Sequence, residues 1–415
     1  MRMRLTNHQK ISSMLIFLPV VLLAVQGVRA ATDGCDGALP YPFSPEFDIA
    51  KVTTLAESLP SHSWEYGTMA EALLELYNPD YAVFGSKAFP VPTLQKKDVR
   101  ALEYAAKKIT FGTGSDGLVN GNGAVGDPAS LGVSAVLLGK TETKYMDAAK
   151  QTAGYLVGST RRQWNGAISH RREVTELWSD FLYMAPPFLA YYAVHTKNGT
   201  LLQESVNQCR WYRQILRANT TSAYKGTWHH IIGPQSADWG LWSTGNAWAA
   251  AGMVRVLATI LNSPFAGTLS WRDAAATDLN WYIREIIEGA MGSPMTGGLV
   301  RNYINDVSGA GGFGEVAGSA LLAATTYRMM VLRPKTFADV KYAKFADEIR
   351  KTLGALDASG KPHVTASGVV TPAVNPLNWK DTKPVTTGSP EAQAFVVLMY
   401  AAWRDCVLKN ICKWV

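Results

Sequence analysis

The sequence has few cysteines, few charged residues and almost no alternation of the kind that predicts β-strands. It contains four cysteines in 415 residues, and 18% of its residues are charged. The patterns H-E-x-x-H, C-x-x-C, G-x-S-x-G and the P-loop are all missing, so metalloprotease, serine esterase and kinase chemistry lose their usual sequence support. The cysteine spacing matches no zinc site. The 47% of hydrophobic residues nevertheless predicts a globular protein with a large core.

A nucleotide cofactor also lacks a sequence basis. The pattern G-x-G-x-x-G occurs three times, at residues 112–117, 121–126 and 309–314, in a chain with 36 glycines. None of these stretches follows a convincing buried strand, whereas a phosphate cradle needs strand, turn and helix in that order. We interpret all three as loops, and we expect no cofactor and no metal.

The first thirty residues have the organisation of a secretory signal. Positive charges in residues 1–10 precede an apolar stretch at 11–28 that Pro19 interrupts, and Ala30 supplies a small residue for cleavage. An uncleaved membrane anchor is the alternative. The longest later apolar stretch, 182–194, has only thirteen residues and contains two prolines. We therefore predict a signal peptide at 1–30, a secreted, extracellular domain at 31–415, and no membrane association after cleavage.

Secretion bears on charge, disulfides and glycosylation. Without the signal the formal net charge falls from +7 to +3, which gives no reason to expect a nucleic-acid partner.

The four cysteines allow three disulfide pairings. A bridge from Cys35 to Cys406 or Cys412 would join the two ends of the chain. Cys209 lies in an apolar helical run and could be a buried thiol. Two N-glycosylation patterns begin at Asn198 and Asn219.

Apolar residues recur at helical spacing in twelve segments separated by loops rich in Gly, Pro, Ser and Asn. The predicted helices are approximately 48–58, 62–77, 98–110, 128–138, 144–159, 176–194, 201–217, 245–261, 271–288, 315–331, 337–353 and 390–407. Asp127-Pro128 and Ser389-Pro390 each place a capping side chain before a proline at the first helical position. Short connections predict antiparallel neighbours, and small-residue faces such as Ala247, Ala250 and Ala251 predict an inner layer. We predict an all-α, single-domain (α/α)6 toroid of six helical hairpins.

One acidic side chain stands out as a candidate for catalysis. Asp180 is followed by fourteen residues without a charge. If apolar neighbours surround the carboxyl group, desolvation raises its pKa, which suits a proton donor near neutral pH. The competing interpretation is that Ser179 or Asp180 only caps the following helix.

Other polar and aromatic candidates are less specific. Asp127 taken by itself is explained better as a helix cap, and His170, His229 and His230 could be partly buried residues with satisfied hydrogen bonds. Indole rings can stack on sugar faces or simply fill a core. The aromatic residues at predicted loop–helix junctions are Trp64, Tyr66, Trp178, Trp228, Trp239, Trp242 and Trp248.

An ordered set of motifs from about residue 60 to 403 resembles a known family. The motifs are Trp64-Glu-Tyr66-Gly67, Asp127-Pro-Ala-Ser-Leu-Gly, Lys144-Tyr-Met-Asp-Ala-Ala, Leu177-Trp-Ser-Asp180, Trp242-Ser-Thr-Gly-Asn246-Ala-Trp248 and Gly388-Ser-Pro-Glu-Ala-Gln-Ala-Phe. Together they look like glycoside hydrolase family 105, the unsaturated rhamnogalacturonyl hydrolases, with the related unsaturated glucuronyl hydrolases close by. The resemblance is nearer to a fungal-type branch and implies the same six-hairpin fold.

The resemblance also implies a site and a reaction. It makes Asp180 the general acid/base and Asp127 the group that holds sugar hydroxyls, with His170 and His230 matching family histidines. Trp64, Tyr66, Trp242 and Asn246 would bind or enclose the sugar. The implied reaction protonates C4 of a C4=C5 double bond in an unsaturated uronic acid, adds water at C5, and releases the next sugar from the resulting hemiketal.

One residue departs from the family pattern. Many members have arginine where this chain has Thr244, so a cation that would bind the uronate carboxylate is missing. His229, His230 and Arg301 are possible replacements. We expect a secreted monomer or weak dimer that acts on pectin-derived oligosaccharides, most of all from rhamnogalacturonan. Two alternatives remain open: a six-hairpin glycosidase or lyase for another saccharide, and a non-catalytic carbohydrate-binding toroid.

Overall fold

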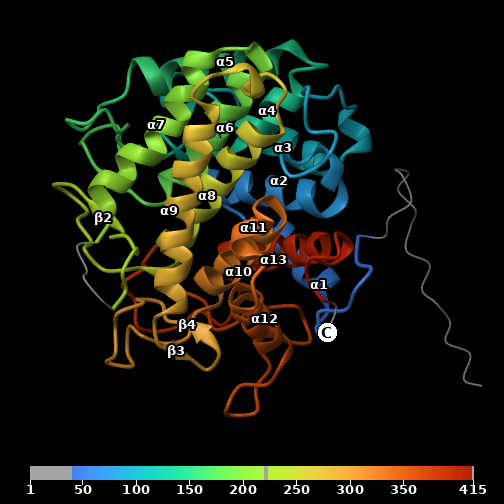
Figure 1. Cartoon of the computed structure of the whole chain (residues 1–415), viewed down its shortest axis with the longest axis vertical. Coiled ribbons are helices and arrows are strands. Elements are labelled where there is room, and N and C mark those ends of the chain that lie inside the picture. The colour runs from blue at the N-terminus through green and yellow to red at the C-terminus, as the bar shows by residue number, and fades with distance from the viewer. Residues whose placement is uncertain (1–39, 219–222, 414–415) are drawn as a thin grey trace, which may run out of the picture. The chain divides into compact units, whose positions relative to one another are not determined.

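Inner and outer helices alternate along the chain in this computed structural model, which describes residues 40–218 and 223–413 (Figure 1). Each inner helix contacts the next, and α13 contacts α2, so that the inner helices close into a ring. The inner helices are α2 (Ser63–Tyr77), η4 (Asp127–Leu131) continued by α4 (Gly132–Leu138), α6 (Phe181–Thr196), α8 (Ser243–Asn262), α10 (Val316–Leu332) and α13 (Pro390–Leu408).

Each inner helix is covered by an outer one that is its neighbour in the sequence, except that α1 packs on α13. The outer helices are α1 (Ile49–Ser58), α3 (Arg100–Lys108), α5 (Thr143–Gly158), α7 (Gly199–Leu216), α9 (Arg272–Met291) and α12 (Val340–Gly354). Short elements complete the described chain: α11 (Pro334–Phe337), η1 (Pro79–Tyr81), η2 (Lys96–Asp98), η3 (Gly114–Asp116), η5 (Ala266–Thr268), and two antiparallel pairs, β1 (Leu177–Trp178) with β2 (Ile231–Ile232) and β3 (Met295–Thr296) with β4 (Leu299–Val300).

The composition of the inner helices explains why they lie inside. Helices α8 and α10 are buried on nearly all sides, whereas α3 and α12 each bury one face and expose charged residues on the other. Small residues allow the inner helices to approach closely. At Gly252 in α8, a Cβ atom would collide with the backbone carbonyl of Leu182 in α6. The predicted small-residue inner layer and the all-α toroid are both confirmed.

The predicted helices agree with the structure to within a few residues, and three starts are informative. Helix α6 begins at Phe181 instead of 176, because residues 177–178 pair with β2. The predicted cap at Asp127 is wrong: this residue is the first of η4, and Gly126 occupies the N-cap position. The cap at Ser389 is confirmed, since its hydroxyl oxygen accepts from the backbone N–H of Ala392.

The disulfide joins Cys406 to Cys412. A bridge from Cys35 to either of them is therefore wrong, and Cys35 itself lies outside the described residues. The physical reason is local: the chain turns back directly after α13 and brings the two Cα atoms to 5.2 Å. Cys209 is a buried free thiol in α7. Asn198 is exposed and caps α7, while Asn219 and the predicted signal peptide lie outside the described residues.

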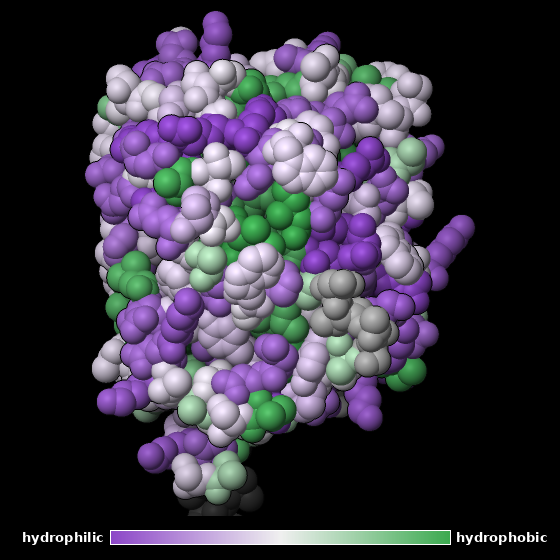
Figure 2. Space-filling view, turned by 90° about the vertical axis from the view of Figure 1, so that its left-hand side faces the viewer, coloured by the Kyte–Doolittle hydropathy of each residue, from purple (hydrophilic) through white to green (hydrophobic). Residues whose placement is uncertain are grey.

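The surface and helix lengths give two further observations. Within residues 40–218 and 223–413, no helix combines the length and apolar character needed to cross a bilayer. On the face shown in Figure 2, hydrophilic side chains predominate, and hydrophobic ones gather mainly in a recess near its middle.

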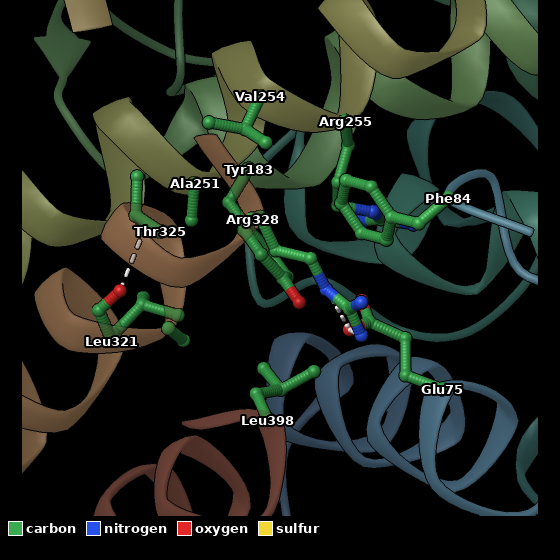
Figure 3. Close-up of a pocket in the computed structure, with 11 residues that line it drawn as sticks. Glu75, Phe84, Tyr183, Ala251, Val254, Arg255, Leu321, Thr325, Arg328 and Leu398 are labelled. Carbon is green, nitrogen blue, oxygen red and sulfur yellow. Dashed lines mark hydrogen bonds and ion pairs between the residues drawn. The ribbon is translucent and has the colours of Figure 1, made fainter. Parts of the chain in front are cut away.

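A network of buried ion pairs lies between the inner helices, and Figure 3 shows one of them, Arg328 with Glu75. Arg328 Nη2 on α10 lies 2.6 Å from Glu75 Oε2 on α2, and its Nη1 lies 2.6 Å from Asp405 Oδ2 on α13. Arg255 on α8 pairs with Glu71 on α2 at 2.7 Å. These pairs join four helices of the ring, and the side chains of Arg328 and Glu75 are 6% and 4% exposed. Because the charges are shielded from water, they depend on one another for solvation.

Candidate active site

A pocket lies where the inner helices begin. Its volume, including the open space at its mouth, is about 810 Å³. Most of its lining comes from the first turns of inner helices or from the loops that lead into them; the full lining is His62, Trp64, Gly121, Asn122, Asp127, His170, Arg171, Trp178, Asp180, Met184, His230, Trp242, Pro376, Leu377, Trp379 and Glu391. Because helix N-termini carry partial positive charge, their convergence favours an anionic ligand here.

Short backbone pairing holds Asp180 beside His230. Strand β1 pairs with β2, and the N–H of Ser179 donates to the carbonyl of His230 at 2.9 Å. Gly245, in the first turn of α8, has no room for a side chain, because a Cβ would collide with Ser179 Oγ. Asp180 Oδ2 consequently lies 3.4 Å from His230 Nε2.

His230 lies between two carboxylates. Its Nδ1 is 3.0 Å from Asp238 Oδ2, which also accepts a hydrogen bond of 2.6 Å from the hydroxyl of Tyr303. The imidazole is fully buried. Burial opposes a charge on the ring, but Asp180 and Asp238 outweigh it and raise the pKa of His230 above its ordinary value. The arrangement favours an imidazolium between Asp238 and Asp180.

Asp180 faces the pocket. The raised pKa that the sequence predicts for it is wrong, because the structure lowers this pKa. Its side chain is 16% exposed and makes no helix-capping hydrogen bond. Burial does act to raise its pKa, as the sequence predicts, but the neighbouring charge on His230 and the contact with it act more strongly. The pKa of Asp180 therefore lies below its ordinary value, and in the free protein the proton of this pair resides on His230.

Asp127 and His170 form a second polar pair in the pocket. His170 Nε2 lies 3.8 Å from Asp127 Oδ1. Burial, together with the negative charge of Asp180, raises the pKa of Asp127 to about 8, so this carboxyl group is protonated at neutral pH. Burial lowers the pKa of His170 to about 3. Both groups are therefore neutral, and each can exchange hydrogen bonds with sugar hydroxyls.

Aromatic rings form the walls. Trp178 stacks on His170 with ring centroids 4.7 Å apart, and Trp379 meets Trp178 edge to face at 5.4 Å. Trp242 lies against His230 at 4.3 Å, and its indole N–H donates to Asn302. Flat apolar walls beside hydrogen-bonding groups are typical of a site that binds a sugar ring.

Sequence reasoning missed several pocket residues. Arg171 is half-buried at the pocket and donates to the carbonyl of Asn122 at 3.0 Å. Trp379 comes from the long loop before α13, where no motif marked it. Glu391 lies within a quoted motif, and the proline-led start of α13 could have placed it at the ring mouth. Asp238 has no sequence signal, since only the hairpin containing β2 brings it to His230.

Some predicted residues lie outside the pocket. Tyr66 follows Trp64 by two positions on α2, so the two side chains point to different sides, and the Tyr66 ring lies under Lys108 Nζ instead. Asn246 is buried, and its amide is occupied by backbone groups of Trp228 and Trp242. The pocket lining also lacks Thr244, His229 and Arg301.

Thr244 and the three residues expected to replace the family arginine differ in whether they reach the pocket. Thr244 is fully buried and lies 3.5 Å from Glu315 Oε2, so this position does not face the pocket. His229 Nδ1 lies against the carbonyl of Trp239, and Arg301 bonds to Thr296 and Asp306. Of the predicted replacements only His230 faces the pocket, where Arg171 supplies a further cation. Among the described residues, no three His, Cys, Asp or Glu side chains gather as a metal site.

A match to a family model shows which protein family this chain belongs to. The model described as Glycosyl Hydrolase Family 88 matches residues 132–339, just over half of the chain. The chain belongs to this family. It is therefore a glycoside hydrolase, and the recognition of a six-hairpin glycosidase from its sequence is confirmed. The matched region of this family 88 hydrolase includes His170, Asp180 and His230, whereas Asp127 and Glu391 lie outside it.

Solved structures show the same fold for this family 88 hydrolase. A possible member of family 105 from Salmonella enterica serovar Paratyphi A is 15% identical with a TM-score of 0.64, and the match covers 87% of this chain and 93% of that one. A family 105 hydrolase from C. acetobutylicum is 16% identical with a TM-score of 0.61, covering 85% and 98%. The unsaturated glucuronyl hydrolase of Bacillus sp. GL1 is 14% identical with a TM-score of 0.56, covering 86% and 94%. Among curated proteins no sequence matches.

Proposed function

We propose that this glycoside hydrolase removes an unsaturated uronic acid from the non-reducing end of pectin-derived oligosaccharides, with rhamnogalacturonan fragments as the main source. The observation that carries the proposal is the Asp180–His230 pair in a pocket lined by tryptophans and reached by Arg171. A pocket favours the end of a saccharide chain over its middle. The relationship to proteins described as family 105 and unsaturated glucuronyl hydrolases supports this substrate class.

In the proposed reaction, Asp180 carries a proton to carbon and then accepts one from water. Entry of the substrate expels water, which makes the separated charges of the Asp180–His230 pair less favourable and moves the proton to Asp180. Asp180 protonates C4, water adds to C5, and Asp180 takes the proton that the water loses. The product is a hemiketal at C5, whose rearrangement releases the next sugar. Asp127, His170 and Trp242 position the ring.

The test is direct, because the C4=C5 double bond conjugated with the carboxylate absorbs ultraviolet light. The mature protein is incubated with oligosaccharides produced by a rhamnogalacturonan lyase, and absorbance and released sugars are followed together. Falling absorbance with release of one sugar supports the proposal. Steady absorbance with other bonds cut favours a glycosidase for another saccharide, and steady absorbance with binding alone favours a carbohydrate-binding toroid.

Arg171 is proposed to bind the uronate carboxylate in place of the family arginine. We expect Arg171→Gln to raise KM about 10- to 100-fold with little change in kcat, because a hydrogen bond to a charged group contributes about 1.5–3 kcal/mol. Arg172→Gln is the matched control, since Arg172 pairs with Asp116 and Glu173 away from the pocket lining. Equal KM values for the two variants would remove Arg171 from the proposal.

Asp238 is proposed to position and charge His230. We expect Asp238→Asn to lower the pKa of His230, because it removes the anion beside Nδ1. The imidazolium is then lost at lower pH, so the alkaline limb of the kcat profile moves downward by about one pH unit. Tyr303→Phe leaves the anion in place and should move the limb less. Profiles that superimpose on the wild type would show that Asp238 serves packing alone.

Secretion is part of the same proposal. The N-terminal charges and apolar run are typical of a signal peptide, and the Cys406–Cys412 disulfide is typical of proteins from oxidising compartments. We expect the mature protein in the medium to begin at Ala31. N-terminal sequencing of that protein and its mass before and after enzymatic deglycosylation test cleavage and the sites at Asn198 and Asn219.

A further inference from the structure

Glu391 is a pocket residue with one carboxyl oxygen left unsatisfied. It lies in the first turn of α13 and is only 3% exposed. Its Oε1 accepts a hydrogen bond of 2.8 Å from the indole N–H of Trp64. Its Oε2 is buried and has no hydrogen-bond partner among the described residues. A buried polar atom without a partner is costly, so its position in the pocket wall points to a ligand as the missing partner.

The surroundings of Glu391 disfavour a charge on it. Acidic groups face it from three neighbouring elements: Glu65 on α2, Glu315 at the start of α10, and Asp180 before α6. Burial acts most strongly, and with these neighbours it raises the pKa of Glu391 well above its ordinary value. The other titratable or charged groups of the pocket are His62, Asp127, His170, Arg171 and His230.

The two oxygens of Glu391 consequently differ in their function. Because Oε1 accepts from Trp64, the proton of the neutral acid resides on Oε2, which becomes a hydroxyl donor. Helix capping does not require this side chain, since Ser389 already caps α13. The Trp64 hydrogen bond fixes the carboxyl plane, and Oε2 has no partner in a residue that lines the pocket.

We propose that Glu391 is a substrate-binding residue that acts as a neutral acid, its Oε2 hydroxyl donating a hydrogen bond to an acceptor oxygen of the bound uronate. This inference rests on the proposed function and adds a recognition contact to it. Glu391 takes no part in proton transfer to carbon; that step belongs to Asp180. The two carboxyl groups therefore have opposite requirements, because Asp180 must exchange its proton and Glu391 must keep it.

Glutamine and alanine substitutions separate a neutral donor from an ionised carboxylate. In Glu391→Gln the amide can still accept from Trp64 and donate with its NH₂ group. We expect Glu391→Ala to raise KM about tenfold with little change in kcat, and Glu391→Gln to recover most of that loss. Trp64→Phe, which removes the orienting hydrogen bond and keeps a smaller aromatic ring in the pocket wall, should also raise KM.

The pH dependence of KM gives the second readout. Ionisation of Asp127 raises KM at alkaline pH in both proteins. In the wild type, loss of the Oε2 proton adds a further rise, which is missing in Glu391→Gln because the amide does not titrate. A merely structural role would leave the two profiles parallel. If Gln is as damaging as Ala, or if Ala leaves KM unchanged, the proposal is overturned.

A third measurement needs no substrate. The infrared difference spectrum of free wild-type protein minus free Glu391→Gln should contain the C=O stretch of a protonated carboxyl group at neutral pH. Its absence would overturn the inference about Glu391 even if unsaturated uronates are hydrolysed. Its presence, in a protein that leaves unsaturated uronates intact, would reject the proposed substrate and keep Glu391 as a neutral donor, to be tested on other saccharides by calorimetry.

Discussion

Replacement of Asp180 by asparagine is expected to lower kcat about 10²- to 10⁴-fold, the range typical of a general acid/base. The amide has nearly the same shape, but it can neither deliver a proton to C4 nor take one from water. Oligosaccharide binding and folding should change little, because Asp180 caps no helix and its side chain reaches the pocket. The measurement is the fall in absorbance of the double bond, with binding followed by calorimetry.

Asp180→Asn is also expected to change the pKa of His230. Asp180 is one of the two carboxylates that raise the pKa of His230, so Asp180→Asn should lower that pKa, which NMR of the histidine ring can follow. Asp147→Asn on the exposed side of α5 is the matched control and should retain full turnover. Turnover within a few-fold of the wild type in Asp180→Asn would reject the assigned role.

The largest effect on stability is expected at Arg328. Arg328→Met removes the shared partner of Glu75 and Asp405; Figure 3 shows Arg328 beside Glu75. Asp405 keeps its ion pair with Arg404 at 2.8 Å, whereas Glu75 is left with no ion pair among the described residues. Breaking a buried ion pair in this way costs about 3–5 kcal/mol of the free energy of unfolding, because the remaining charge is neither hydrated nor paired. Equilibrium denaturation in urea measures the change.

An exposed ion pair of the same length provides the control. Arg210 Nη2 lies 2.6 Å from Asp278 Oδ2, but these side chains are 52% and 39% exposed. Arg210→Met should therefore cost about 1 kcal/mol or less. If the two variants lose equal stability, burial is not what makes the Arg328 network important. Partial recovery in a variant that combines Arg328→Met with Glu75→Gln would confirm that the unpaired carboxylate causes the loss.

The site shows which inferences a sequence supports. Asp180, Asp127, His170, His230, Trp64 and Trp242 all line one pocket, and each precedes or begins a predicted helix, where a toroid gathers its loops. Tyr66 and Asn246 were predicted beside them because they share the same motifs. A motif records order along the chain, whereas a helix turns its residues to different sides, so motif membership alone could not place these two.

The sequence determined the helices and their layers, because hydrophobic periodicity and side-chain size are properties of each segment by itself. Small apolar residues on most sides of α8 and α10 make them inner helices. Protonation was decided only by the tertiary structure. Hydrophobic neighbours in the sequence predict a raised pKa for Asp180, but His230 is fifty positions away in the chain and 3.4 Å away in space. Electrostatic energy depends on distance in space, so only the fold could assign the proton to His230.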